Sequence, residues 1–354
     1  MSGWCLSILT MPEKPTDPSR ILIVGAGAMG LVAGYHLHLA GAEITFLVRP
    51  GRVEAVARPK TLYCYDDATL KTFSAFKVIS DATEISSSSF TYIIVTLDGF
   101  SAREPEGVSL LQTIGRAIRD ASTCVIIGGV GVGLHDFYCT AMALPEDRVL
   151  NGALGLMSHQ VEGFPLPVHQ PTNLNVLSKA DVAYRHISNN GFLLDDNSLE
   201  AAEHFARLYD ASEMSRCHIM PRQEFAMMTK VMFPVFAVSE LLGWPRAKDL
   251  GADPELWALT VHAVQEIQGL DEHGSIGKTA QGSLTGDSLL ELWSSFENAT
   301  LPLDFAGFNK LHHGGKVRSQ DIKLLQDCVD LGERQGSEMK ALKQLLVQVR
   351  AEPH

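Results

Sequence analysis

The sequence predicts an α/β fold, with an N-terminal Rossmann-type, doubly wound parallel sheet and an all-α C-terminal half. An apolar run at residues 21–24 leads into glycines spaced as G-x-G-x-x-G and then into an apolar helical stretch. Short apolar runs alternate with helical patterns up to about residue 153, which indicates parallel strands joined by helices. From residue 222 onward the periodicity is helical, with almost no strand signal.

The glycine-rich turn is typical of a dinucleotide site. Gly25 permits a tight bend, Gly27 lets a pyrophosphate approach the backbone, and Gly30 lets the helix pack close to the strand. The helix N-terminus would attract phosphate with its free N–H groups. Gly41 ends the helix, and residues 43–48 form a second strand. We therefore expect the cofactor to contact Gly25, Ala26, Gly27, Ala28, Met29 and Gly30.

The end of the second strand indicates which dinucleotide binds. An NAD site places an Asp or Glu there to bind the ribose 2′-hydroxyl. Here Arg49 and Arg52 occupy that place without a carboxylate, and guanidinium groups suit a 2′-phosphate. NADP(H) is the predicted cofactor, and the alternative is that both arginines are solvated loop residues.

Composition narrows the class of protein. The chain has 354 residues and a net charge of −12, which argues against nucleic acid or an anionic membrane as partner. Six cysteines lack metal-ligand spacing, so free thiols in the cytoplasm are expected. No apolar run reaches the ~20 residues of a membrane span. Residues 1–19 read as a disordered lead-in.

Further elements follow from the local patterns. We expect a hairpin from residues 61–65 and 73–78, and edge strands of the sheet at 174–177 and 183–187. The other expected strands are 90–97, 123–127 and 148–153, and the expected helices are 108–119, 134–144, 197–209, 222–242, 254–268, 284–298 and 320–350. This divides the chain into a nucleotide-binding domain, 20–212, and a helical substrate or dimerisation domain, 213–354.

The opening turn, the arginine after the second strand and the all-helical second half resemble the ketopantoate reductase (ApbA/PanE) family. The resemblance implies an NADPH-dependent reduction of a 2-keto acid to a 2-hydroxy acid. It is plain over residues 21–52, weaker over 90–133, and in the C-terminal half rests on helix order and a few positions. The protein would be a divergent member.

The resemblance carries over unevenly to the cofactor loops. The family typically has a lysine after the strand that ends near Val95, where this chain has Thr96-Leu97-Asp98. The family's Asn-Gly-Leu-Gly signature, with an asparagine beside the nicotinamide, falls at Gly128 to Gly133, where no asparagine is present. Leu97 and Gly129 are the implied cofactor-binding positions in these two loops.

In the second half the resemblance points to Lys230 as the catalytic lysine, because it lies in the apolar segment FAMMTKVMFPV. A lysine in such surroundings has a lowered pKa and can protonate the developing alkoxide. A helix lysine whose head reaches solvent is the alternative. The family's asparagine one turn later is replaced by Pro234, which predicts a kink and a free carbonyl at Lys230.

The stretch His312 to Asp321 corresponds to the family's loop that carries a substrate-binding glutamate. Asp321 or Gln320 lies nearest that glutamate, and Asn309 stands at a polar substrate-contact position. Asp321 could orient Lys230 or be a solvated acid at a helix start. Lys316 and Arg318 could bind a substrate carboxylate or form a solvated basic loop.

Other patterns are ambiguous. His312-His313 has no third ligand at readable spacing, so no metal is predicted. Methionines and phenylalanines between residues 225 and 236 could line an apolar substrate pocket or form a packing face.

The first hypothesis is an NADPH-dependent reductase of a 2-keto acid or related ketone that is bulkier or less polar than ketopantoate. The second is a protein that keeps the fold but not the redox chemistry, as an isomerase, cyclase or nucleotide-regulated binding protein. A dehydrogenase of a polyol phosphate or opine is a third possibility. Such an enzyme would need a catalytic histidine, and no histidine in this sequence is placed convincingly for that role. A homodimer is possible.

Overall fold

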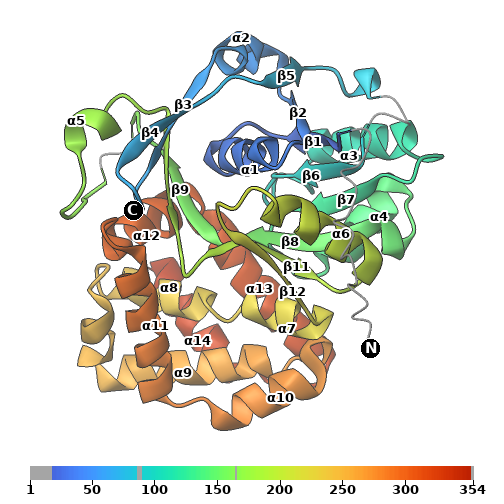
Figure 1. Ribbon diagram of the computed structural model, residues 1–354. Coiled ribbons are helices and arrows are strands. Elements are labelled where there is room, and N and C mark those ends of the chain that lie inside the picture. The colour runs from blue at the N-terminus through green and yellow to red at the C-terminus, as the bar shows by residue number, and fades with distance from the viewer. Residues whose placement is uncertain (1–17, 86–89, 164–165, 352–354) are drawn as a thin grey trace, which may run out of the picture.

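The computed structural model describes residues 18–85, 90–163 and 166–351. The expected disordered lead-in lies outside the described residues, apart from its last two positions. Figure 1 shows a sheet-containing N-terminal part above a layer of helices formed by the C-terminal part. None of the helices in the described ranges is long and apolar enough to cross a membrane.

The main sheet has eight strands in the order β12-β11-β8-β7-β6-β1-β2-β5. Six neighbouring strands are parallel, while β11 runs antiparallel to β8 and is itself parallel to β12. The strands are β1 (Arg20–Val24), β2 (Glu43–Leu47), β5 (Phe76–Ile79), β6 (Tyr92–Val95), β7 (Cys124–Ile127), β8 (Val149–Leu154), β11 (Asn190–Asp195) and β12 (Arg216–Met220). The doubly wound, largely parallel sheet predicted from the sequence is confirmed.

Three central strands end level with one another. Val24 of β1 pairs with Val95 of β6, which pairs with Ile127 of β7. The order in which strands are added to the sheet reverses at β1, because β2 lies on one side of β1 and β6 on the other. In open α/β sheets ligands bind at the carboxyl ends of strands at such a switch point.

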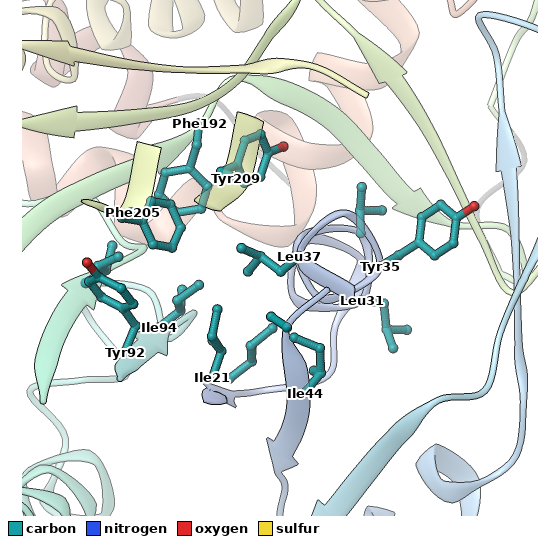
Figure 2. Packing of buried hydrophobic residues seen from close by; sticks show 14 of the residues in the cluster. Ile21, Leu31, Tyr35, Leu37, Ile44, Tyr92, Ile94, Phe192, Phe205 and Tyr209 are labelled. Atoms are coloured by element: carbon teal, nitrogen blue, oxygen red, sulfur yellow. The ribbon is translucent and has the colours of Figure 1, made fainter. Parts of the chain in front are cut away.

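Helices cover both faces of this sheet. The helices α1 (Ala28–Leu39) and α6 (Leu199–Asp210) pack on one face, and α3 (Pro105–Ala117) and α4 (Leu134–Met142) pack on the other. Figure 2 shows Ile21, Ile44 and Ile94 of the strands directed toward Leu37 of α1. Each such fully buried aliphatic side chain contributes roughly 1.5–3 kcal/mol. The glycine turn is therefore fixed to a well-packed core.

A second sheet of four strands lies beside α1 in the order β4-β3-β10-β9. Its strands are β3 (Lys60–Cys64), β4 (Thr69–Phe73), β9 (Leu156–Gln160) and β10 (Val182–His186). The hairpin partner expected at residues 73–78 is wrong, because β3 pairs with β4 while β5 joins the edge of the main sheet. The strand expected at 183–187 belongs to this second sheet and not to the main one.

The segment 174–177 is also corrected, from a strand to the short helix α5 (Leu174–Leu177). The segment is helical because the preceding residue, Asn173, caps the helix: its side chain accepts a hydrogen bond from the N–H of Val176. A short helix, α2 (Val53–Ala57), follows the turn after β2.

The C-terminal layer is helical, as predicted. It contains α7 (Arg222–Met228), α8 (Phe233–Leu241), α9 (Pro254–Gln268), α10 (Gly274–Ser283), α11 (Gly286–Thr300), α12 (Phe305–Leu311), α13 (Arg318–Arg334) and α14 (Lys340–Ala351). The long helix expected at 320–350 is two helices, and the chain turns between them at Gly336, which has a φ of +83°. The division expected at residues 212/213 falls just before β12, which ends at Met220.

The expected helix 222–242 is interrupted at Thr229–Met232. Pro234 stands in the first turn of α8, where a missing N–H is tolerated, and so starts a new helix. The predicted break is confirmed, but the carbonyl of Lys230 is not free, since the N–H of Phe233 donates to it at 3.2 Å.

Candidate active site

The glycine-rich turn has the geometry that its spacing predicts. Gly25 has a φ of +104°, and a Cβ there would lie 2.5 Å from Oγ1 of Thr96. A Cβ on Gly30 would lie 2.4 Å from the carbonyl oxygen of Gly25. No described atom lies within 4 Å of the place where a Cβ of Gly27 would point. Gly25 and Gly30 are thus required for packing, while Gly27 faces open space.

The N-terminus of α1 is uncapped and borders a cavity. Gly27 is the N-cap residue and offers no side chain to the first N–H groups of the helix. A cavity of about 140 Å³ opens in front of this turn. Its lining comes from both halves of the chain and consists of Gly27, Ala28, Met29, Gly30, Thr96, Ser158, His159, Gln160, Leu166, Phe308, Leu311, His312 and Lys316. Bare N–H groups facing a cavity can bind an anion such as a diphosphate.

Arg49 and Arg52 flank a single 3₁₀ turn, Pro50–Arg52, directly after β2. Both are exposed, and within the described residues neither side chain has an ion-pair or hydrogen-bond partner. Since β2 is adjacent to β1, they lie on the side of the glycine turn where the adenosine half of a dinucleotide rests. The two guanidinium groups are thus available to a 2′-phosphate.

The loops after β6 and β7 approach each other closely. A Cβ on Gly129 would lie 2.5 Å from the carbonyl oxygen of Leu97, so glycine is required there. Arg103 fastens the two loops together, because its guanidinium donates to the carbonyls of Gly99 and Val132 at 2.9 and 2.8 Å. Leu97 itself packs partly into the core under α3 and α4. These loops form one unit beside the glycine turn.

Lys230 is almost fully buried, at 3% exposure, in the turn between α7 and α8. Its Nζ donates to the carbonyl of Ala226 at 2.7 Å and lies 3.1 Å from Oε1 of Glu272. Its neighbour Val231 packs on the same apolar cluster as Val130 of the loop after β7. Lys230 therefore lies below that loop, and the reading in which its head reaches solvent is wrong.

Glu272 is a site residue that the sequence reasoning missed. It is on a 3₁₀ turn, Asp271–His273, which precedes α10. Burial raises the pKa of Glu272, but the contact with His273 and the charge of Lys230 outweigh it and lower the pKa to about 2. A buried lysine in an apolar segment is expected to have an acidic partner. No feature of the sequence near Lys230 identifies that partner as Glu272, which lies 42 positions later.

His273 completes this buried group. Its Nδ1 lies 2.9 Å from the carbonyl oxygen of Ile267, so Nδ1 carries a proton, and its Nε2 lies 3.4 Å from Oε1 of Glu272. His273 is fully buried. The Glu272 carboxylate thus lies between Lys230 and the His273 ring, and its ion pair with Lys230 fixes the position of the ammonium group.

Asp321 lies in another part of the helical layer. Its Oδ2 is 2.8 Å from Nδ1 of His313, whose ring stacks on Phe236. Burial and the nearby Glu240 raise the pKa of Asp321 to about 8, and burial lowers the pKa of His313 to about 3. This is a neutral acid hydrogen-bonded to a neutral imidazole. No contact in the described structure links Asp321 to Lys230, so the structure does not bring these two predicted residues together.

The two predicted substrate residues lie at different depths. Asn309 of α12 is 4% exposed, and Gln320 of α13 is half-buried. Neither lines the cavity, whereas their neighbours Phe308 and His312 do. Phe233 and Phe236 pack against each other inside the helical layer, which favours the packing-face reading of that segment.

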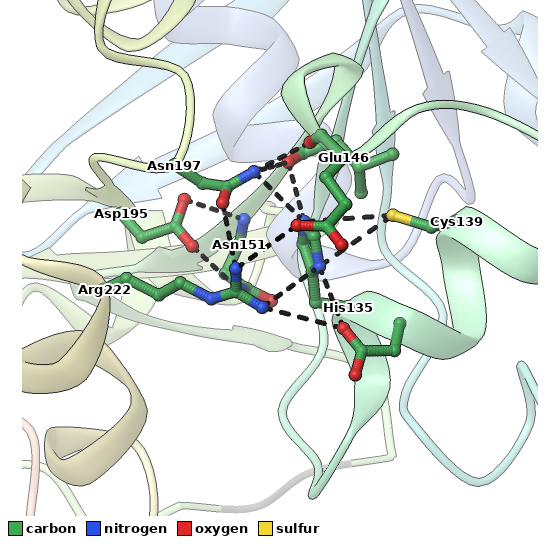
Figure 3. A network of polar contacts seen from close by, with 9 residues as sticks. His135, Cys139, Glu146, Asn151, Asp195, Asn197 and Arg222 are labelled. Carbon is green, nitrogen blue, oxygen red and sulfur yellow. Dashed lines mark hydrogen bonds and ion pairs between the residues drawn. The ribbon is translucent and has the colours of Figure 1, made fainter. Parts of the chain in front are cut away.

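A polar network ties α7 to the sheet (Figure 3). Asn151 of β8 donates from its side chain to Asp195 of β11 at 2.7 Å. Arg222, the first residue of α7, donates to the side chain of Asn197 at 3.0 Å and approaches His135 at 3.4 Å. Asp195 is fully buried, and that burial raises its pKa. The network fixes the start of the helix that ends next to Lys230.

Comparisons with known proteins agree with this geometry. Residues 21–170 match the family model described as ketopantoate reductase PanE/ApbA. A 2-dehydropantoate 2-reductase from Geobacter metallireducens GS-15 aligns with a TM-score of 0.67 at 19% identity, over 94% of this chain and 99% of that one. A ternary structure of D-mandelate dehydrogenase with NADH and anilino(oxo)acetate aligns with a TM-score of 0.63 at 16% identity, over 94% and 97%.

A 2-dehydropantoate 2-reductase from Methylococcus capsulatus aligns with a TM-score of 0.66 at 15% identity, over 94% of this chain and 96% of that one. Identities this low show a shared fold. No curated protein sequence matches the chain.

Proposed function

We propose that this chain is a divergent relative of the ketopantoate reductases and acts as an NADPH-dependent reductase of a 2-keto acid or related ketone. The observation that carries the proposal is the bare N-terminus of α1 facing a cavity shared by both halves. That arrangement suits a dinucleotide whose diphosphate rests on the turn and whose nicotinamide extends toward the loops after β6 and β7.

The free arginines after β2 favour NADPH over NADH. Arg49 and Arg52 would bind the 2′-phosphate through charge-assisted hydrogen bonds, and no acid competes with them at the end of the strand. The five cysteines within the described residues are free thiols, which suits an enzyme that works in the cytoplasm.

The cofactor supplies a hydride to one face of the substrate carbonyl. Lys230 would supply the proton for the developing alkoxide, with Glu272 holding its ammonium group in place. Lys230 does not line the cavity, and 140 Å³ is smaller than the ~300–1,000 Å³ of a ligand pocket. We therefore expect the two halves to separate when cofactor and substrate bind, exposing Lys230.

The substrate is expected to be bulkier or less polar than ketopantoate. Phe233 and Phe236 pack against each other and are not evidence for an apolar substrate. The evidence is the cavity, where Leu166, Phe308 and Leu311 form an apolar wall. The polar partners that the family uses are missing at Gly128 and Pro234.

The test is a kinetic panel. Purified protein is assayed for NADPH and NADH oxidation with ketopantoate, pyruvate and phenylpyruvate, and with Lys230→Met as the inactive reference. We expect turnover with NADPH, a higher kcat/KM for phenylpyruvate than for pyruvate, and loss of turnover in the variant. Binding of NADPH without oxidation by any 2-keto acid would contradict the reductase.

Two observations favour a second candidate, a non-redox isomerase, cyclase or nucleotide-regulated binding protein. Lys230 is buried in an ion pair, and the loop at Gly128 has no asparagine to bind the nicotinamide or substrate. Under this alternative, a substrate would be converted without a change in oxidation level and without consumption of NADPH. Measuring NADPH oxidation together with product mass separates the two candidates.

A further inference from the structure

One positive charge expected near the diphosphate is absent from the sheet-containing half. The loop after β6 carries Asp98, and this side chain is turned back onto its own loop. Its carboxylate accepts hydrogen bonds from the N–H groups of Phe100 and Ser101 at 3.0 and 2.7 Å and from the hydroxyl of Ser101 at 2.7 Å. The guanidinium of Arg103 in the same loop donates to the carbonyls of Gly99 and Val132, so the loop offers no uncommitted cation to a phosphate.

A lysine from the other half lies at the same cavity. Lys316 ends a short π-helical turn, His312–Lys316, and lines the cavity together with Gly27 to Gly30 of α1. It is exposed, and no acidic side chain of the described residues lies within ion-pair distance of it. Its charge is felt by His312, whose pKa is lowered to about 3 by burial, by His313 and by Lys316. Lys316 is thus an unpaired cation facing an anion-binding turn.

The turn that carries Lys316 is held in place by packing. A Cβ on Gly314 would lie 2.8 Å from the ring of Trp244, so the backbone lies directly against the indole. The N–H of Val317 donates to the carbonyl of His312 at 2.9 Å and closes the turn. Short π-helical turns often occur at functional sites. The backbone of this turn is therefore held in place within the helical half.

We propose that Lys316 binds the diphosphate of the dinucleotide from the helical half, opposite the N-terminus of α1. The inference rests on the proposed function and names the residue that links cofactor binding to the second half. A diphosphate fits better than a substrate carboxylate, because residues 27–30, whose uncapped N–H groups can bind phosphate, line the same cavity as Lys316. In a chain with a net charge of −12, a cation at this cavity would offset the repulsion that the rest of the protein exerts on such an anion.

The test compares Lys316→Ala and Lys316→Arg with Lys310→Ala, a matched control on an exposed lysine of α12. Dissociation constants are measured for NADPH, NADH, ADP-ribose and adenosine 2′-monophosphate. The first three ligands contain the diphosphate, and the last contains only the 2′-phosphate. We expect Lys316→Ala to weaken the first three about tenfold and to leave the last unchanged. Lys316→Arg should recover most of the loss, and Lys310→Ala should bind all four like the parent protein.

Three results would overturn the inference. Unchanged dinucleotide binding with a raised KM for the keto acid would assign Lys316 to the substrate carboxylate. An equal loss in Lys310→Ala would show only a general effect of charge. If the parent protein bound none of the four ligands, the proposed function would fail together with this inference. If the parent protein bound them and the Lys316→Ala variant bound them equally well, only this inference would fail.

Discussion

Nζ of Lys230 lies 3.1 Å from Oε1 of Glu272, inside the helical layer and below the loop that follows β7. The two residues come from different turns, one before α8 and the other before α10. The pair gives the lysine an acidic partner in an otherwise apolar segment. It also allows the structural role of the lysine to be separated from its role in proton transfer.

Replacing Lys230 by Met should lower both stability and activity. The variant leaves Glu272 without its cation, and because the Glu272 side chain is 30% exposed we expect a loss of about 2 kcal/mol, less than for a fully buried pair. Turnover should fall at least ~100-fold, since general acid catalysis contributes 10²–10⁴. Urea unfolding and steady-state kinetics measure the two effects.

The double variant Lys230→Met/Glu272→Gln is the control for this prediction. Removing both charges should restore most of the unfolding free energy, because no buried charge is left unpaired. Turnover should stay lost. Recovery of turnover along with stability would show that Lys230 is not the proton donor.

Arg49→Ala should reduce the preference for NADPH. The guanidinium has no partner in the described structure, so removing it costs no internal contact. We expect KM for NADPH to rise about tenfold and KM for NADH to change less than twofold. Arg58→Ala is a suitable comparison, since Arg58 is already paired with Asp181. A parallel rise for both cofactors would place Arg49 away from the 2′-phosphate.

Gly129→Ala and Gly131→Ala should differ sharply in stability. A Cβ on Gly129 would lie 2.5 Å from a backbone oxygen, whereas a Cβ on Gly131 would meet only side chains at 3.4 Å or more. The first substitution should force the loops after β6 and β7 apart, lower the melting temperature by several degrees and weaken dinucleotide binding. The second should be tolerated. Equal melting temperatures would mean that the two loops are not held in contact.

Asp321→Asn should make stability less dependent on pH. The pKa of Asp321 is raised to about 8 by burial and by Glu240, compared with ~3.9 in an unfolded chain. Between these values the folded protein retains a proton that the unfolded chain has released. The stability contributed by Asp321 is therefore fully present below about pH 4 and is lost as the pH rises toward about 8.

Asparagine is neutral throughout, so the advantage of the variant over the parent should grow from pH 4 to pH 8 and then level off. Urea unfolding at pH 5, 6.5, 8 and 9 measures this difference, with the exposed Asp120→Asn as the control. A constant difference across this range would show that Asp321 is ionised in the folded protein.

The first unit of the fold was predictable because its signals are local. The strand before Gly25, the helix that ends before Gly41 and the second strand each follow from neighbouring residues, and the structure has all three. The break in the helix after Lys230 was also predictable, because Pro234 acts on its own helix.

Pairings over long distances were not predictable from local pattern. The partner of β3 was misassigned because β4 and β5 both alternate in the same way, and tertiary packing decides which of them forms the hairpin. Glu272 was missed for a similar reason, since ion pairing depends on how α7 and α10 pack together. The surroundings of Asp321 were likewise set by His313 in the turn His312–Lys316 and by Glu240 of α8, which are distant from each other in the sequence.

The alignment of Val24, Val95 and Ile127 in one row has an evolutionary consequence. The loops that follow β1, β6 and β7 all begin at the same edge of the rigid sheet, which serves as their common platform. Any one of these loops can therefore change in length or composition without displacing the others. Chemistry can then diverge by exchanging a loop, as the glycine-rich stretch after β7 illustrates, while the platform beneath it stays intact.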